Sequence, residues 1–190
     1  LAILTGGVET DSEFVFVCSA SGHLIALNQI DGSFGWKASI SSESLAPPKV
    51  DNDLVVVQTI DGKVAGYGAS DGSKRWEYAA KIPPLTLRGT STPMIYDDIV
   101  IAGFSNGRIA FITRDDGLAA FEQIVGVPEG VSDLEKLVDL DGKMAIENNV
   151  LYIAGYQGKL IAIDLRAGEI LWEREASSLA GVSFGFGNVY

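Results

Sequence analysis

The feature that most constrains this chain is a sequence frame that occurs four times. In each copy a glycine is followed ten residues later by a second glycine and, four residues after that, by an aromatic residue. The sets are Gly22, Gly32 and Trp36; Gly62, Gly72 and Trp76; Gly107, Gly117 and Phe121; and Gly158, Gly168 and Trp172. A repeat in fixed register indicates that one supersecondary structure is built several times.

Each first glycine lies between two runs rich in β-branched and aromatic residues, as Gly62 does between residues 54–58 and 63–67. Such a glycine is predicted to form a tight hairpin turn with positive φ, and the second glycine forms the next hairpin. A weaker strand precedes each set, followed by a polar turn such as residues 51–53. Each copy is therefore predicted to contain four antiparallel strands, A to D.

Four short strands that recur about every 40–45 residues are typical of β-propeller blades, each of which buries its faces against its neighbours. We predict an all-β fold, a partial β-propeller domain over residues 1–190 with about four complete blades. The blades are expected at residues 1–42, 43–82, 89–126 and 138–177, with the start of a fifth at residues 180–190.

Both ends of the chain fall inside the repeat pattern, at Leu1 and at Tyr190. We therefore expect an open array of blades, which would leave apolar faces and unpaired strand edges at its ends. A twofold partner would bury them. We predict a homodimer formed through the terminal blades or through strand pairing at residues 182–190.

Composition excludes several classes of function. The chain has 25 acidic and 14 basic residues, a formal net charge of −11, which argues against nucleic acid as a partner. Its apolar runs are strand-length and too short for a membrane helix. The single cysteine, Cys18, lies in an apolar strand and is predicted to be a buried hydrophobic side chain. The single histidine, His23, lies in a turn, and no catalytic triad or metal-ligand spacing is present.

The connections after Trp76 and Phe121 are longer than the first, and both are predicted to leave on the face that carries the B–C turns. In the first insertion, two prolines hold the chain extended and put Leu85 and Leu87 on one side, beside Arg88. This trio is a candidate partner-binding hot spot. The alternative is that the two leucines pack under the loop into the core between blades.

The second insertion contains a capping box at residues 132–135, which predicts a short helix. Asp139 and Asp141 alternate about Leu140 and should project together near the start of strand A. They lack the further ligands of a calcium loop. The alternative is that they are solvated turn aspartates.

Turn charges predict a polarised surface. The B–C turns carry basic side chains or histidine, and the C–D turns carry acidic ones. The two sets are His23, Lys63, Arg108 and Lys159, and Asp31, Asp71, Asp115 and Asp116.

The segment Ala162-x-Asp164-x-x-Ala167-Gly168-x-x-x-Trp172 resembles the tryptophan-docking repeat of quinoprotein propellers, in which the indole of one blade packs against the next. The third copy departs from it at Thr113 and Phe121, so its junction is expected to be looser. The loop Leu85-Thr86-Leu87-Arg88-Gly89 together with Asp139-Leu140-Asp141 more specifically resembles the BamB family, the lipoprotein subunit of the outer-membrane β-barrel assembly machinery.

This resemblance implies a non-enzymatic scaffold without a cofactor, built as an eight-bladed propeller on the periplasmic side of the outer membrane. The family is anchored by a lipidated N-terminal cysteine, which Cys18 is not. The resemblance also implies that the periplasmic POTRA region of BamA, and unfolded outer-membrane proteins, are partners. The binding residues it implies are Leu85, Leu87, Arg88, Asp139 and Asp141.

Because other propellers have the same repeat, two alternative functions remain. One is a fragment of a quinoprotein dehydrogenase that uses PQQ. The other is a propeller sensor or interaction domain attached to another module.

Overall fold

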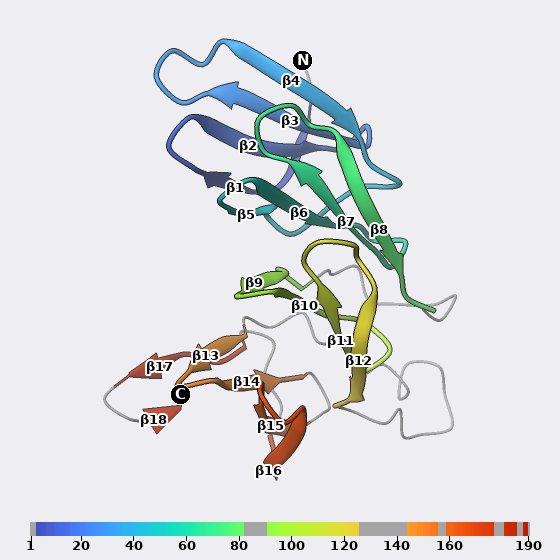
Figure 1. Cartoon of the computed structure of the whole chain (residues 1–190), viewed down its shortest axis with the longest axis vertical. Helices are drawn as coiled ribbons and strands as arrows, with labels where there is room; N and C mark the ends of the chain where they lie inside the picture. The colour runs from blue at the N-terminus through green and yellow to red at the C-terminus, as the bar shows by residue number, and fades with distance from the viewer. Residues whose placement is uncertain are drawn as a thin grey trace. The chain divides into compact units, whose positions relative to one another are not determined.

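The fold is shown by a computed structural model that describes residues 3–81, 91–125, 144–155, 159–176, 181–185 and 188–189 (Figure 1). The chain divides into two compact units. They are Leu1–Lys81, Thr92–Ala102 and Phe111–Ala120, and Ile82–Ser91, Gly103–Ala110 and Phe121–Tyr190. The described residues form strands, turns and irregular connections without a helix. Within these ranges no helix is long and apolar enough to cross a membrane.

The strands form four antiparallel sheets of four strands, in which neighbours follow chain order (Figure 1). We call these sheets blades 1 to 4 and keep the letters A to D for their strands. Blade 1 contains β1 (Leu4–Thr10), β2 (Phe14–Ser19), β3 (His23–Asn28) and β4 (Phe34–Ser39), and blade 2 contains β5 (Lys49–Asp51), β6 (Leu54–Gln58), β7 (Lys63–Gly68) and β8 (Lys74–Ala79). Blade 3 contains β9 (Met94–Tyr96), β10 (Ile99–Gly103), β11 (Arg108–Thr113) and β12 (Ala119–Ile124). Blade 4 contains β13 (Ala145–Glu147), β14 (Val150–Ala154), β15 (Lys159–Asp164) and β16 (Glu169–Glu175).

The sequence prediction of four antiparallel strands per copy is therefore confirmed. The start of a fifth sheet follows as the hairpin of β17 (Phe184–Gly185) and β18 (Asn188–Val189). Phe184 stacks on Tyr152 of blade 4, with ring centroids 5.8 Å apart. The outer blade boundaries, the continuity of residues 1–190 as one array and the pairing of two copies stay predictions.

The core of each sheet lies along its two middle strands. All five residues of β6 are buried, whereas on β8 only Trp76 is. A middle strand has a hydrogen-bonded neighbour on each side, and apolar residues on both of its faces are covered by packed side chains. Strand D has one neighbour, so most of its side chains face solvent.

The glycines of the frame make the hairpin turns as predicted. The first glycines, Gly22, Gly62 and Gly107, have φ of 75°, 79° and 71°. The second glycines, Gly32, Gly72, Gly117 and Gly168, have φ of 70°, 68°, 72° and 70°. Gly158 lies outside the described residues. Residues with a Cβ disfavour this left-handed region. Glycine therefore recurs in the frame because the same turn recurs.

Aspartates reinforce the C–D turns. Asp71 Oδ1, for example, accepts a hydrogen bond from the amide N–H of Ser73 at 2.9 Å. Hydrogen bonds from within the turn hold the carboxyl pKa values below their usual range at Asp31, Asp71, Asp116 and Asp164. Such a cap depends only on nearby residues, and the aspartate directly precedes the second glycine in three copies, whereas Asp164 lies four positions before Gly168.

The aromatic residue of each of the first three frames docks on the second glycine of the next blade. The Trp36 indole N–H donates to Ala69 O at 2.8 Å, and a Cβ on Gly72 would lie 2.4 Å from Trp36 Cε3. At the third junction a Cβ on Gly168 would lie 3.4 Å from Phe121 Cζ, and a phenyl ring has no N–H to donate. This agrees with the looser junction expected there.

Candidate functional site

The five residues predicted to bind a partner, Leu85, Leu87, Arg88, Asp139 and Asp141, lie in residues 82–90 and 126–143, outside the described residues. The predicted helix at residues 132–135 lies outside them as well. The structure does describe the residues at which each insertion leaves its blade and returns to a strand. These anchor points define where the insertions begin and end.

Each insertion leaves its own blade beside the B–C turn. The amide N–H of Ala80 donates to Gly62 O at 2.9 Å, and that of Val125 donates to Gly107 O at 2.8 Å. The equivalent bond in blade 1, where the connection is short, joins Ile40 N to Gly22 O at 3.0 Å. In blades 1 to 3 the residue that follows strand D bonds to the first glycine of its frame, so the exit point is the one expected from the antiparallel order of strands.

The first insertion returns through a buried serine. Ser91 is 1% exposed, and its Oγ donates to Gly103 O and accepts from Gly103 N, both at 3.0 Å. The second insertion returns at Met144, which is also buried. The described ends of both insertions are therefore hydrogen-bonded or buried.

The predicted polarisation of the turn surfaces needs correction. Among the described residues, three of the basic B–C turn residues pair with a glutamate on strand D of their own blade, fourteen positions later. The pairs are Lys63 with Glu77 at 3.1 Å, Arg108 with Glu122 at 3.4 Å and Lys159 with Glu173 at 2.6 Å. Strands C and D are hydrogen-bonded neighbours, so long side chains on them meet and neutralise each other. Hydrogen bonds from Lys74 and Lys63 hold the pKa of Glu77 below its usual value.

Blade 1 differs at these two positions, which carry His23 and Lys37. The ring of His23 contacts Ser21, with Nδ1 and Oγ 3.1 Å apart. Burial raises the pKa of the Cys18 thiol to about 11, so the side chain is uncharged near neutral pH. Cys18 is therefore the buried side chain that was predicted, and His23 is partly exposed beside the B–C turn.

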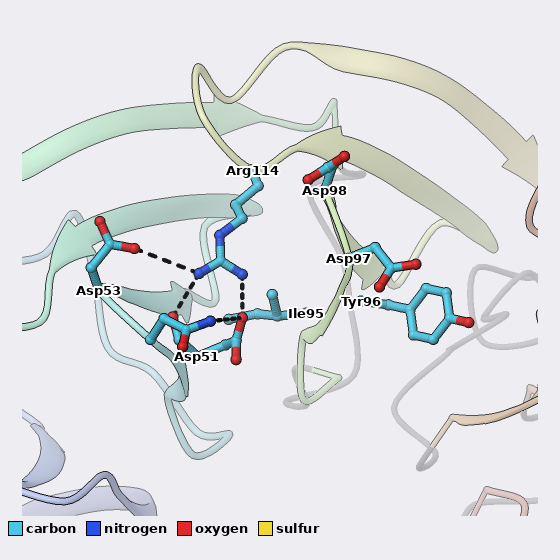
Figure 2. Close-up of a pocket in the computed structure, with 8 residues that line it drawn as sticks. Asp51, Asp53, Ile95, Tyr96, Asp97, Asp98 and Arg114 are labelled. Atoms are coloured by element: carbon cyan, nitrogen blue, oxygen red, sulfur yellow. Dashed lines mark hydrogen bonds and ion pairs between the residues drawn. The ribbon is translucent and has the colours of Figure 1, made fainter.

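A polar pocket that the sequence reasoning missed lies between the A–B turns of blades 2 and 3, within the first unit (Figure 2). It has a volume of about 760 Å³ and is lined by Asp51, Asn52, Asp53, Ile95, Tyr96, Asp97, Asp98 and Arg114. Figure 2 shows Asp51 and Asp53 turned toward Arg114. The sequence signal that indicates this pocket is Arg114, because the equivalent positions of the other copies carry Gln29, Ala69 and Leu165.

Two of the four aspartates that line this pocket form ion pairs with arginine. Arg114 forms an ion pair with Asp51 and donates to the Asp51 backbone O at 2.7 Å. Asp53 lies 2.6 Å from Arg75 and 3.6 Å from Arg114. The hydrogen bond from Arg75 lowers the pKa of Asp53, and the charge of Arg114 adds to this. Within the described part of the chain, no group of three or more histidine, cysteine or acidic residues is arranged to hold a metal ion.

Comparison with known proteins shows a match over nearly the whole chain. A family model described as outer membrane protein assembly factor BamB matches residues 2–190. The BamB of Yersinia pestis is 32% identical over 189 residues, which is 100% of this chain and 48% of the relative. The BamB of Pseudomonas aeruginosa is 43% identical over 109 residues, which is 57% of this chain and 29% of the relative. The chain thus spans at most about half the length of these relatives.

Solved structures agree with the sequence comparison. The crystal structure of BamB from Moraxella catarrhalis matches with a TM-score of 0.90 and 31% identity, over 95% of this chain and 56% of that one. Quinohemoprotein alcohol dehydrogenase from Comamonas testosteroni matches with a TM-score of 0.74 at 13% identity, over 93% of this chain and 35% of that one. The second likeness shows the propeller fold alone. This chain, with its tryptophan-docked blades, belongs to the BamB family of outer membrane protein assembly factors.

Proposed function

We propose that this chain is part of a non-enzymatic scaffold for outer-membrane protein assembly, acting on the periplasmic side of the outer membrane. The observation that carries the proposal is the family match over residues 2–190, with relatives named as outer membrane protein assembly factors. A scaffold needs a rigid body and presented binding segments. The blades supply the body, and the two insertions are the candidate binding segments.

The proposed partner is the periplasmic POTRA region of BamA, the barrel-forming subunit. The proposed contacts are Leu85, Leu87 and Arg88 in the first insertion and Asp139 and Asp141 in the second. Support comes from the anchor points, because Ala80 and Val125 each end their strand D beside a B–C turn. Arginine is among the residues enriched at interface hot spots, which supports a contact through Arg88.

We expect Arg88→Ala or Leu87→Ala to weaken binding to the BamA POTRA region by about 1–3 kcal/mol while leaving the chain folded. The measurement is titration calorimetry, with thermal melting to confirm the fold. The matched control is Arg166→Ala, which removes an exposed arginine from a C–D turn of blade 4. Wild-type affinity in a folded Arg88→Ala variant contradicts this assignment.

Asp139→Ala and Asp141→Ala are expected to weaken binding to the same POTRA partner. Charge-assisted hydrogen bonds to a basic side chain across the interface are the chemistry that these two carboxylates offer. If only the leucine–arginine loop affects binding, the second insertion has another role.

The competing enzyme hypothesis rests on the fold that the chain shares with a quinohemoprotein alcohol dehydrogenase at 13% identity. We expect PQQ with calcium to leave the melting temperature unchanged. A ligand held at one hundred times its Kd would stabilise the native state by about 2.7 kcal/mol. Calcium alone serves as the control, and a saturable rise in the melting temperature with PQQ would favour the enzyme.

A further inference from the structure

In every blade, the residue that follows strand C is linked by a backbone hydrogen bond to the turn between strands A and B. Its amide N–H donates to the A–B turn of its own blade, always at 2.9 Å. The four bonds are Gln29 N to Glu13 O, Ala69 N to Asp53 O, Arg114 N to Asp98 O and Leu165 N to Asn149 O. At Ala69 and Arg114 the carbonyl also accepts the indole N–H of the preceding blade, from Trp36 and Trp76. The backbone of this residue therefore bonds within its own blade in all four blades, and at Ala69 and Arg114 it also bonds to the preceding blade.

Arg114 adds a side chain to that junction. Its guanidinium reaches back to the preceding blade, where it pairs with Asp51 and donates to the Asp51 backbone O at 2.7 Å (Figure 2). A guanidinium that contacts both a carboxylate and a carbonyl has little freedom to rotate, since its donors form a rigid planar fork. The Arg114 side chain is 15% exposed and the Asp51 side chain 47%, so solvent reaches the pair mainly from the aspartate side.

The backbone carbonyl of Arg114 accepts the Trp76 indole N–H at 2.7 Å. Arg114 thus holds blade 2 at two places, at strand D through its carbonyl and at the A–B turn through its side chain. Fixing either contact restrains the other, because both belong to one residue. Ala69, the equivalent residue for Trp36, has only a methyl side chain and cannot act in this way.

We propose that Arg114 is a conformational lock, in which its ion pair with Asp51 holds the carbonyl that fixes the docked indole of Trp76. The lock is particular to the junction of blades 2 and 3. The neighbouring junction uses different groups, since the Tyr67 hydroxyl donates to Ser39 O at 3.1 Å there. This role is independent of the proposed assembly function.

The test is hydrogen exchange of the indole N–H groups, followed by NMR on the 190-residue chain. Arg114→Ala and Asp51→Asn are each expected to accelerate exchange of the Trp76 indole about tenfold, as for loss of a hydrogen bond to a charged group. The Trp36 indole, bonded to Ala69 O, is the internal control and should change less than about twofold. Arg114→Lys keeps the charge without the fork and should give an intermediate rate.

Arg75→Ala is the matched control variant, because it removes the other cation bound to Asp53 and leaves the Arg114–Asp51 pair in place. It should leave Trp76 exchange near the wild-type rate. Unchanged Trp76 exchange in the folded Asp51→Asn variant overturns the proposal. Equal acceleration at Trp36 and Trp76 also overturns it, because it reports general destabilisation. Asp51→Asn keeps the arginine and carries the test if Arg114→Ala does not fold.

Discussion

Replacing Trp76 with alanine is expected to lower the free energy of unfolding by about 3–5 kcal/mol, the cost of removing a large aromatic side chain from a core. Trp76 is 5% exposed and lies between Gly66 of its own blade and Gly117 of the next. Its loss leaves a cavity and also leaves the Arg114 carbonyl without the indole N–H. Denaturant unfolding followed by circular dichroism measures the change.

Two further variants separate packing from hydrogen bonding at this site. Trp76→Phe places at this position the residue that blade 3 has at Phe121, and should cost about 1–2 kcal/mol for the smaller ring and the lost donor. Trp172→Ala is the control, since Trp172 holds the same frame position and is only half-buried. Its cost should be clearly smaller. A loss below about 1 kcal/mol in Trp76→Ala contradicts a structural role for the docked indole.

Gly72→Ala is the second substitution with a large expected effect, and Gly32→Ala is its matched control. The two glycines hold the same turn position, with φ of 68° and 70°. A Cβ on Gly32 would meet nothing within 4 Å, whereas a Cβ on Gly72 would lie 2.4 Å from Trp36 Cε3. Both variants therefore carry the free-energy cost of a Cβ at positive φ. They differ in whether that Cβ meets the Trp36 indole.

We expect Gly32→Ala to destabilise the chain by about 1–2 kcal/mol, the cost of a left-handed residue with a Cβ. Gly72→Ala should cost about 2–5 kcal/mol, because overpacking adds about 1–3 kcal/mol when the indole is displaced. Chemical denaturation gives both values, and the emission of Trp36 reports its movement. Equal losses in the two variants would show that the glycine is required for its φ alone.

Local structure could be predicted from the sequence because each turn depends on a few residues. The frame glycines require positive φ, and the apolar runs between them have strand length. The predicted strand at residues 54–58 coincides with β6. The docking of Trp36 and Trp76 on the next blade followed from the resemblance of the frame to a known repeat.

The candidate binding residues remain predictions. Leu85, Leu87, Arg88, Asp139 and Asp141 lie in insertions that interrupt the frame, and a repeat says nothing about residues it does not contain. Their assignment came from a resemblance between short motifs. The anchors at Ala80 and Val125 establish only where each insertion leaves its strand.

Other features were decided by tertiary structure. Counting turn charges predicted a polarised surface, but Lys63 meets Glu77 because strands C and D are neighbours. Arg114 and Asp51 are 63 positions apart, and nothing local to either residue indicates that they form an ion pair. The sequence by itself determined the turns and strands, since these depend on φ preferences and on side-chain alternation. Which charges are paired depends on the pairing of strands within a blade and on the packing of one blade against the next, and only the folded chain supplies both.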